Sequence, residues 1–159
     1  MIRNATSADV GFIYGLYMHP NVNTYLLYEP MPLESFEPIY SDLLVKGVQY
    51  VFENDSQLTG MCKMVPLTYR SAHVVYLGGI AIHPGFSGKG MGLQMMKEIQ
   101  QQCKEKKYLR IELSVAVNNE PAIRLYKKTG FEEEGLLRKY GYLSGENRFV
   151  DEIMMSYLM

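Results

Sequence analysis

HPGFSGKGMG, residues 83–92, sets four glycines directly before a pattern typical of a helix, whose apolar face is marked by Leu93, Met96, Ile99 and Cys103. Glycine loses much conformational entropy on folding, so it is expected where bare backbone is needed. The first turn of a helix offers unpaired N–H groups and a positive dipole end, and glycines let an anion approach them. The segment predicts a phosphate-binding loop, with a ligand-free glycine turn as the alternative.

The spacing of these glycines excludes two common phosphate loops. Gly88-x-Gly90-x-Gly92 lacks the Gly-Lys-Ser/Thr ending of a Walker loop. It also differs from the Gly-x-Gly-x-x-Gly spacing of dinucleotide-binding proteins. The loop taken alone therefore names no ligand.

Around this loop the chain reads as a mixture of strands and helices. We expect strands at residues 2–6, 48–53, 57–67, 72–83, 108–117, 131–143 and 148–159, and helices at residues 6–20, 33–47, 93–107 and 118–130. A loop at residues 21–32 joins the first two helices. This order predicts a single α/β domain over residues 1–159, with about four helices on a central twisted sheet that is mixed and mostly antiparallel.

Two of the expected strands carry further information. Gly78 and Gly79 interrupt the strand before the glycine loop, which predicts a bulge or a close backbone approach. The strand at residues 108–117 alternates. Its apolar face holds Leu109, Ile111, Leu113, Val115 and Val117, and its other face holds Arg110, Glu112, Ser114 and Ala116.

The composition is that of a soluble globular protein, with 47% hydrophobic residues, 21% charged residues and a net charge of −1. The near-neutral charge argues against a nucleic-acid partner. Neither Cys62 nor Cys103 lies at the sequence spacing from another Cys or a His that metal ligands usually have, so we expect no metal site. Cys103 lies on the apolar face of its helix and should be a buried free thiol. No signal peptide and no apolar run of about 18 residues is visible, which favours a cytoplasmic protein without a membrane partner.

A second motif follows the strand at residues 108–117. Residues 119–131, NEPAIRLYKKTGF, read Asn-x-x-Ala-x-x-Leu-Tyr-x-x-x-Gly-Phe. With the glycine segment before it, in this order and at this spacing, the chain resembles the GCN5-related N-acetyltransferases, the GNAT superfamily. The resemblance covers nearly the whole chain and is strongest to bacterial small-molecule or amino-acid acetyltransferases. It implies a GNAT-like fold.

The resemblance implies acetyl-CoA as the cosubstrate. Its diphosphate would lie on the amides of Gly88, Lys89, Gly90, Met91, Gly92 and Leu93. Its pantetheine arm would pair with Ile80, Ala81 and Ile82 where the glycine bulge splays the strands, and Asn119 and Tyr126 would complete the site. Ser87 departs from the family, which usually has Arg or Gln there, so we expect weaker cofactor binding rather than none.

The resemblance also implies the reaction: a primary amine attacks the thioester directly, through a tetrahedral intermediate. A backbone N–H of Ile80 or Ile82 would stabilise the oxyanion, a contribution commonly of about 3 kcal/mol. Tyr126 stands at the position of the general acid that protonates the leaving thiolate. The alternative is that Tyr126 only packs on the apolar face of its helix.

Glu112 is the candidate general base, acting directly or through water. The alternatives are that Glu112 pairs with Arg110 or another cation, that His73 or Glu29 serves instead, or that a chain of water carries the proton.

In this family the region at residues 21–31 shapes the acceptor site. Tyr25, Tyr28 and Glu29 are therefore expected to bind the acceptor, together with Ser114. The alternative is that these side chains only cover the core. The expected acceptor is a small-molecule amine or an amino acid, and a homodimer could form through the edge of the strand at residues 147–159.

Three other functions stay open from the sequence. The acceptor could be a protein N-terminus or a lysine. The chain could bind acetyl-CoA without turnover. It could also bind a nucleotide phosphate unrelated to acetyl transfer, in which case the second motif would be coincidence.

Overall fold

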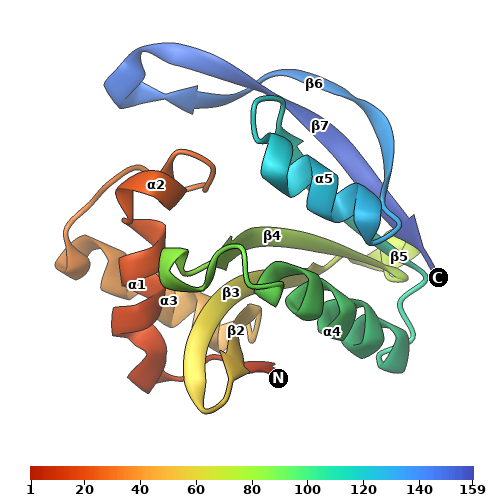
Figure 1. Cartoon of the computed structure of the whole chain (residues 1–159), viewed down its shortest axis with the longest axis horizontal. Helices are drawn as coiled ribbons and strands as arrows, with labels where there is room; N and C mark the ends of the chain where they lie inside the picture. The colour runs from red at the N-terminus through yellow and green to blue at the C-terminus, as the bar shows by residue number, and fades with distance from the viewer.

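Seven strands form one sheet in the order β1-β2-β3-β4-β5-β7-β6, in a computed structural model that describes residues 1–159 (Figure 1). The strands are β1 Ile2–Asn4, β2 Gln49–Asn54, β3 Gln57–Pro66, β4 Val74–Ile82, β5 Arg110–Ala116, β6 Glu132–Leu143 and β7 Arg148–Leu158. Only β4 and β5 run parallel, and every other neighbouring pair is antiparallel. The predicted α/β class and the mixed, mostly antiparallel sheet are confirmed.

Five α-helices cover the two faces of this sheet. They are α1 Val10–Tyr17, α2 Pro20–Asn23, α3 Leu33–Val45, α4 Met91–Glu105 and α5 Glu120–Lys128. Successive residues of a strand point to opposite faces. Accordingly, Val51 packs with α1 and α3, whereas its neighbour Phe52 packs with α4 and α5. Both α4 and α5 lie on the face of Phe52, and in the view of Figure 1 α5 is seen above β4 and α4 below it.

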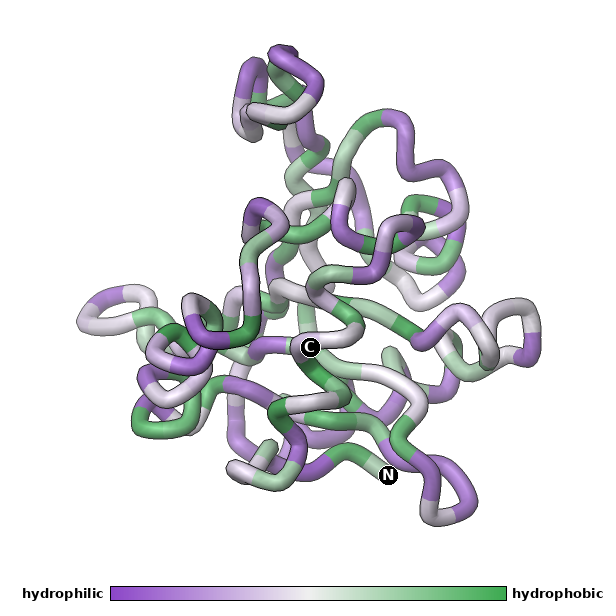
Figure 2. Tube along the Cα trace, turned by 90° about the vertical axis from the view of Figure 1, so that its left-hand side faces the viewer, coloured by the Kyte–Doolittle hydropathy of each residue, from purple (hydrophilic) through white to green (hydrophobic).

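The core agrees with most of the predicted pattern. Cys103 is fully buried and free, as predicted. Leu109 and Val117 were expected on the buried face of β5, but they are 57% and 43% exposed because they lie just outside the strand. In Figure 2 the turns at the periphery are mostly hydrophilic. None of the helices combines the length and the apolarity that a membrane span requires.

The segment between β1 and α3 differs from the prediction. The first helix ends at Tyr17 rather than near residue 20, and a short helix, α2, starts at Pro20 within the expected loop. Proline disfavours helical conformation in the residue before it, and His19 is extended. The imidazole Nδ1 of His19 then accepts a hydrogen bond from the Asn21 amide at 3.2 Å, which caps the new helix.

Strand β7 is not an edge strand, so the predicted route to a homodimer is wrong. β7 pairs with β5 on one side and with β6 on the other. The edge belongs to β6, whose register shifts near Gly135 and again between Leu137 and Gly141. Such irregularities protect an edge from pairing with another chain. The homodimer itself stays a prediction.

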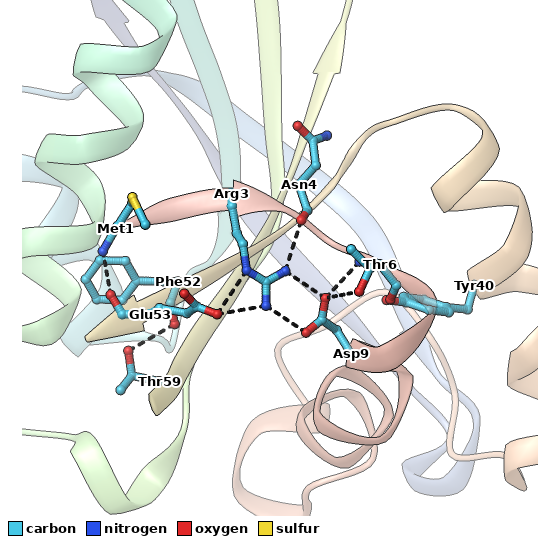
Figure 3. A network of polar contacts seen from close by, with 9 residues as sticks. All are labelled: Met1, Arg3, Asn4, Thr6, Asp9, Tyr40, Phe52, Glu53 and Thr59. Atoms are coloured by element: carbon cyan, nitrogen blue, oxygen red, sulfur yellow. Dashed lines mark hydrogen bonds and ion pairs between the residues drawn. The ribbon is translucent and has the colours of Figure 1, made fainter. Parts of the chain in front are cut away.

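Arg3 joins β1, β2 and the start of the first helical segment (Figure 3). Its guanidinium donates to both carboxylate oxygens of Asp9, at 2.8 and 2.9 Å, and to Glu53 Oε1. The Asp9 side chain, only 5% exposed, also accepts from the Thr6 amide at 2.8 Å. These charge-assisted bonds, with Arg3 contributing most, lower the pKa of Asp9.

Candidate active site

The glycine loop leads from β4 into α4 and has the backbone that its sequence predicts. Gly88 and Gly90 have φ angles of 74° and 79°, a left-handed conformation that favours glycine. Gly90 is the N-cap residue of α4. A Cβ at Gly92 would lie 3.1 Å from Leu125 Cδ2, so this glycine lets α5 pack close to the start of α4.

A run of backbone amides in this loop has no acceptor within the chain. Gln94 is the first residue of α4 whose amide has a backbone acceptor, and it donates to Gly90 O at 3.1 Å. The amides of residues 88–93 donate to no backbone carbonyl. Six consecutive free donors at the positive end of a 15-residue helix fit the charge of a diphosphate.

Two side chains flank these amides. Lys89 Nζ donates to Gly85 O at 3.0 Å and lies over the Phe86 ring. Ser87 is exposed and extended. Lys89 therefore adds a positive charge beside the loop, whereas Ser87 has too short a side chain to reach as far as the arginine or glutamine of the family pattern.

The predicted bulge lies at the end of β4. Met61 pairs with Ala81 and Lys63 with Gly78, so Gly79 and Ile80 stand opposite the single residue Cys62. Gly79 has a φ of 55°, and a Cβ there would lie 2.6 Å from the Tyr17 hydroxyl. Only glycine fits this backbone without displacing Tyr17.

Beside the bulge the sheet is open. β4 and β5 pair only through Val74–Tyr76 and Arg110–Glu112. Further along, residues 77–82 and residues 113–116 have no ladder partner across the gap between the two strands. Ile80, Ala81 and Ile82 therefore present an unpaired strand edge next to the glycine loop.

Tyr126 lies on α5, among the buried residues of the α4 side of the sheet, and is 6% exposed. Burial raises the pKa of its phenol well above 10, and Tyr76 and Cys62 raise it further. The hydroxyl has no hydrogen-bond partner. Gln102 Oε1 is the only fully buried side-chain polar atom without a partner. The Tyr126 hydroxyl is therefore not fully enclosed and is free to hydrogen-bond a ligand.

Asn119 is the N-cap residue of α5. Its Oδ1 accepts from the Ala122 amide at 3.4 Å. The side chain is half-buried, and its amide nitrogen makes no hydrogen bond within the chain. Asn119 thus has a free donor next to the open strand β5.

A cavity of about 490 Å³ lies on the opposite face of the sheet, beside α1 and α2. Three parts of the chain line it: residues 23–29, the sheet from β3 to β5, and the β6–β7 hairpin. Figure 1 shows the hairpin reaching toward α2. The Ser144 amide donates to Glu29 Oε1 at 3.0 Å, which ties the hairpin to the loop after α2.

The four residues predicted to bind the acceptor all line this cavity, although Ser114 is far from the others in sequence. Tyr25, Tyr28 and Glu29 form one wall. Ser114 Oγ shares a hydrogen bond of 3.0 Å with the Tyr76 hydroxyl on the floor. Tyr28 also packs edge-on against the buried ring of Tyr17. The structure therefore brings the predicted set together.

Two of the candidate bases, Glu112 of β5 and His73 in the turn before β4, are not brought into this cavity. Glu112 does not line it, and its carboxylate accepts from Arg110 Nε at 3.0 Å, the pairing that the sequence left open. Arg110 also binds Glu134 with both terminal nitrogens. His73 is exposed and outside the lining. Glu112 is thus held in a structural ion pair away from the cavity.

Sequence reasoning missed most of the cavity lining, including three polar residues of the sheet: Lys63 from β3, Tyr76 from β4 and Glu152 from β7. A lysine inside the apolar run 61–65 was a visible signal for Lys63, since lysine is almost never fully buried without a partner. No signal in the sequence placed Glu152 opposite Ala116, because that pairing joins strands far apart in the chain. No group of three or more His, Cys, Asp or Glu side chains could hold a metal ion.

Comparison with known proteins supplies the family. The model of the GNAT acetyltransferase family matches residues 23–131. The chain belongs to this family. This GNAT protein is 31% identical to the L-amino acid N-acetyltransferase AaaT of Escherichia coli K12, over 98% of this chain and 96% of that protein. It is also 31% identical to an N-alpha-acetyltransferase of Sulfurisphaera tokodaii, over 94% and 89% of the two chains.

The fold of this GNAT protein matches solved structures. One is the spermidine N-acetyltransferase of Vibrio cholerae in complex with CoA and spermine, with a TM-score of 0.86. The sequence identity is 24%, and the match covers 99% of this chain and 94% of the other. The GNAT protein is therefore an N-acetyltransferase that acts on amines, with the fold of enzymes that bind CoA.

Proposed function

We propose that this enzyme transfers the acetyl group of acetyl-CoA to the primary amine of a small molecule or an amino acid. The observation that carries the proposal is the opening between β4 and β5. It has six free loop amides at one end and opens beside the 490 Å³ cavity on the other face of the sheet. A ligand with a diphosphate and a long amide-bearing arm fits such a path.

The cofactor residues follow from this path. The amides of Gly88, Lys89, Gly90, Met91, Gly92 and Leu93 hold the diphosphate, and the Lys89 ammonium adds charge. The edge of Ile80, Ala81 and Ile82 pairs with the amides of the arm. Asn119 contributes its free amide nitrogen. Ser87 adds no contact, so the backbone supplies most of the binding.

Acetyl-CoA supplies an acetyl thioester, and the chain supplies the positions and the protons. An N–H of Ile80 or Ile82 beside the bulge donates to the oxygen that becomes negative as the amine attacks. Tyr126 gives its proton to the sulfur as the carbon–sulfur bond breaks. The attacking amine loses its proton to Glu152, a cavity carboxylate that accepts no hydrogen bond within the chain. Glu112 has no part in this step because Arg110 holds it.

Tyr25, Tyr28, Glu29 and Ser114 bind the acceptor in this proposal. The proposed location is the cytoplasm, where the two free cysteines, both buried, would stay reduced.

Calorimetric titration with acetyl-CoA, with ATP as the comparison ligand, tests the proposal. We expect one-to-one binding of acetyl-CoA and none of ATP, followed by release of CoA when amines are added. No binding of acetyl-CoA at millimolar concentration would contradict the proposed function. Binding without turnover of any amine would favour the non-catalytic alternative.

A further inference from the structure

Lys63 is the only lysine or arginine that lines the cavity. It comes from the middle of β3, where Cys62 and Met64 point to the α4 side of the sheet. Lys63 therefore points to the opposite side, toward α1 and the cavity. The residue is only 8% exposed, and lysine is rarely buried to this degree without a partner.

No carboxylate of the chain pairs with this ammonium. Lys63 takes part in none of the ion pairs of the molecule. Its nearest polar contact is the Tyr28 hydroxyl, at 3.5 Å from Nζ, and the ammonium lies 5.0 Å from the centre of the Tyr28 ring. Burial lowers the pKa of Lys63. A buried cation with one long, neutral contact is costly unless a ligand provides an anion.

The Lys63 side chain lies next to the bulge where the acetyl transfer is proposed to occur. A Cβ at Gly79 would lie 3.3 Å from Lys63 Cε, so the side chain passes directly beside the bulge. Two carboxylates also line the cavity. Glu29 is held by the Ser144 amide, whereas Glu152 stands free on β7, on the far side of β4 and β5. The cavity thus has a positive wall on β3 and a negative wall on β7.

We propose that the acceptor carries a carboxylate a few bonds from its amine, as a free amino acid does, and that Lys63 binds that carboxylate. Glu152 then faces the amine. This inference rests on the proposed acetyl transfer and narrows its acceptor. A polyamine would bring only positive charge to Lys63, and a peptide N-terminus has an amide where the free acid has its carboxylate.

The test compares each L-amino acid with its own carboxamide, and with spermidine, as acceptors for the whole enzyme with acetyl-CoA. Lys63→Met is the variant, and Lys46→Met, an exposed lysine of an i,i+4 pair, is the matched control. Because a carboxamide also changes the basicity of the amine, the informative quantity is the acid-to-amide ratio of kcat/KM in the variant relative to the wild type. Calorimetric binding of the acid to the enzyme–CoA complex gives a second readout without turnover.

We expect Lys63→Met to lower this ratio by about 10- to 100-fold, the range of a charge-assisted hydrogen bond, chiefly through a higher KM for the acid. The carboxamide should keep its kcat/KM, and Lys46→Met should change nothing. An equal loss for acid and amide would overturn the inference, because it would mean that Lys63 supports the fold or moves a proton. If amides or spermidine are acetylated and Lys63→Met leaves kcat/KM for the acid unchanged, the inference about Lys63 is overturned but the proposed acetyl transfer is not. Failure of acetyl-CoA to bind would overturn the proposed function with it.

Discussion

Tyr126 is the residue whose environment most directly predicts a kinetic effect. Its hydroxyl has no partner within the chain, and burial raises its pKa. Tyr126→Phe removes only the hydroxyl and should leave stability nearly unchanged. We expect kcat to fall by about 100-fold or more, with the KM for acetyl-CoA unchanged, because a general acid is lost.

The matched control for Tyr126 is Tyr157→Phe, since Tyr157 packs at the border of the same cluster against Phe131. Its kcat should equal that of the wild type. The raised pKa means that Tyr126 keeps its proton at neutral and mildly basic pH. No loss of kcat from its ionisation is therefore expected below pH 10. Full activity of Tyr126→Phe would contradict the acid role and favour simple packing.

Gly79 should tolerate no other residue. Gly79→Ala forces a side chain onto a φ of 55° and brings its Cβ to 2.6 Å from the Tyr17 hydroxyl. We expect the free energy of unfolding to fall by about 3 kcal/mol, from backbone strain and overpacking together. Urea unfolding measures this loss.

The double variant Gly79→Ala with Tyr17→Phe separates these two causes. It removes the clashing oxygen but keeps the strained backbone. About half of the loss should return, so the two changes should not be additive. Strict additivity would show that contact with the Tyr17 hydroxyl is not what requires glycine at this position.

At the scale of elements, the Arg3–Asp9 pair fixes β1 and β2 to the segment that starts α1 (Figure 3). Asp9→Asn should lower the free energy of unfolding by about 2 kcal/mol at pH 7, since charged hydrogen bonds are lost. The folded-state pKa of Asp9 is lowered from 3.8. Its contribution is therefore complete above that value and disappears as pH falls through the lower, folded-state pKa.

The measurement is urea unfolding of both proteins at pH 7 and near pH 3. The difference between wild type and Asp9→Asn should shrink at the lower pH. Asp42→Asn is the control, because Asp42 forms an exposed pair with Lys46 that should contribute only tenths of a kcal/mol. A difference that stays constant with pH would contradict the role of the Asp9 charge.

The elements also show what sequence alone could predict. Strand alternation and the helix face ending at Cys103 depend on local pattern, and local pattern was sufficient for them. The break at His19 was not predicted, although Pro20 disfavours helical conformation in the residue before it and the apolar periodicity ends at Tyr17. The place of β7 between β5 and β6 depends on pairing between strands far apart in sequence, which no local pattern specifies.

For the whole molecule, the bond between Glu29 and the Ser144 amide closes the cavity between two distant segments. Glu29→Ala should raise the KM for the acceptor by about 2- to 10-fold, the value of one hydrogen bond, and leave the KM for acetyl-CoA unchanged. Hydrogen exchange at the Ser144 amide should become faster.

Glu29→Gln separates this structural bond from direct attraction of the amine by charge. It keeps an acceptor oxygen for Ser144 but has no negative charge. A wild-type KM in Glu29→Gln supports the structural bond. If Glu29→Gln is as impaired as Glu29→Ala, the charge itself binds the acceptor, as the sequence first suggested.

The sequence indicated the cofactor side of the candidate site more completely than the acceptor side. The proposed cofactor residues come chiefly from two contiguous motifs, so the family resemblance could name them from the sequence. The acceptor side is assembled from the loop after α2, the middle of the sheet and the hairpin. Tyr25, Tyr28 and Glu29 were named because residues 21–31 shape the acceptor site in the family that the chain resembles, and the structure places all three at the cavity. Lys63 and Glu152 were missed because only the folded sheet brings them to one cavity.

The pairing between β4 and β5 involves only three residues on each strand, so the rigidity of the sheet should depend on whether a ligand fills the gap between them. This short ladder joins the two halves of the sheet, β1 to β4 on one side and β5, β7 and β6 on the other. Without a ligand, few hydrogen bonds hold the two halves together. A cosubstrate whose arm supplies amide groups would complete the missing rungs. The stiffness of the enzyme, and its lifetime against proteases, would then increase with the fraction of molecules that hold this arm, whether or not the arm carries an acetyl group.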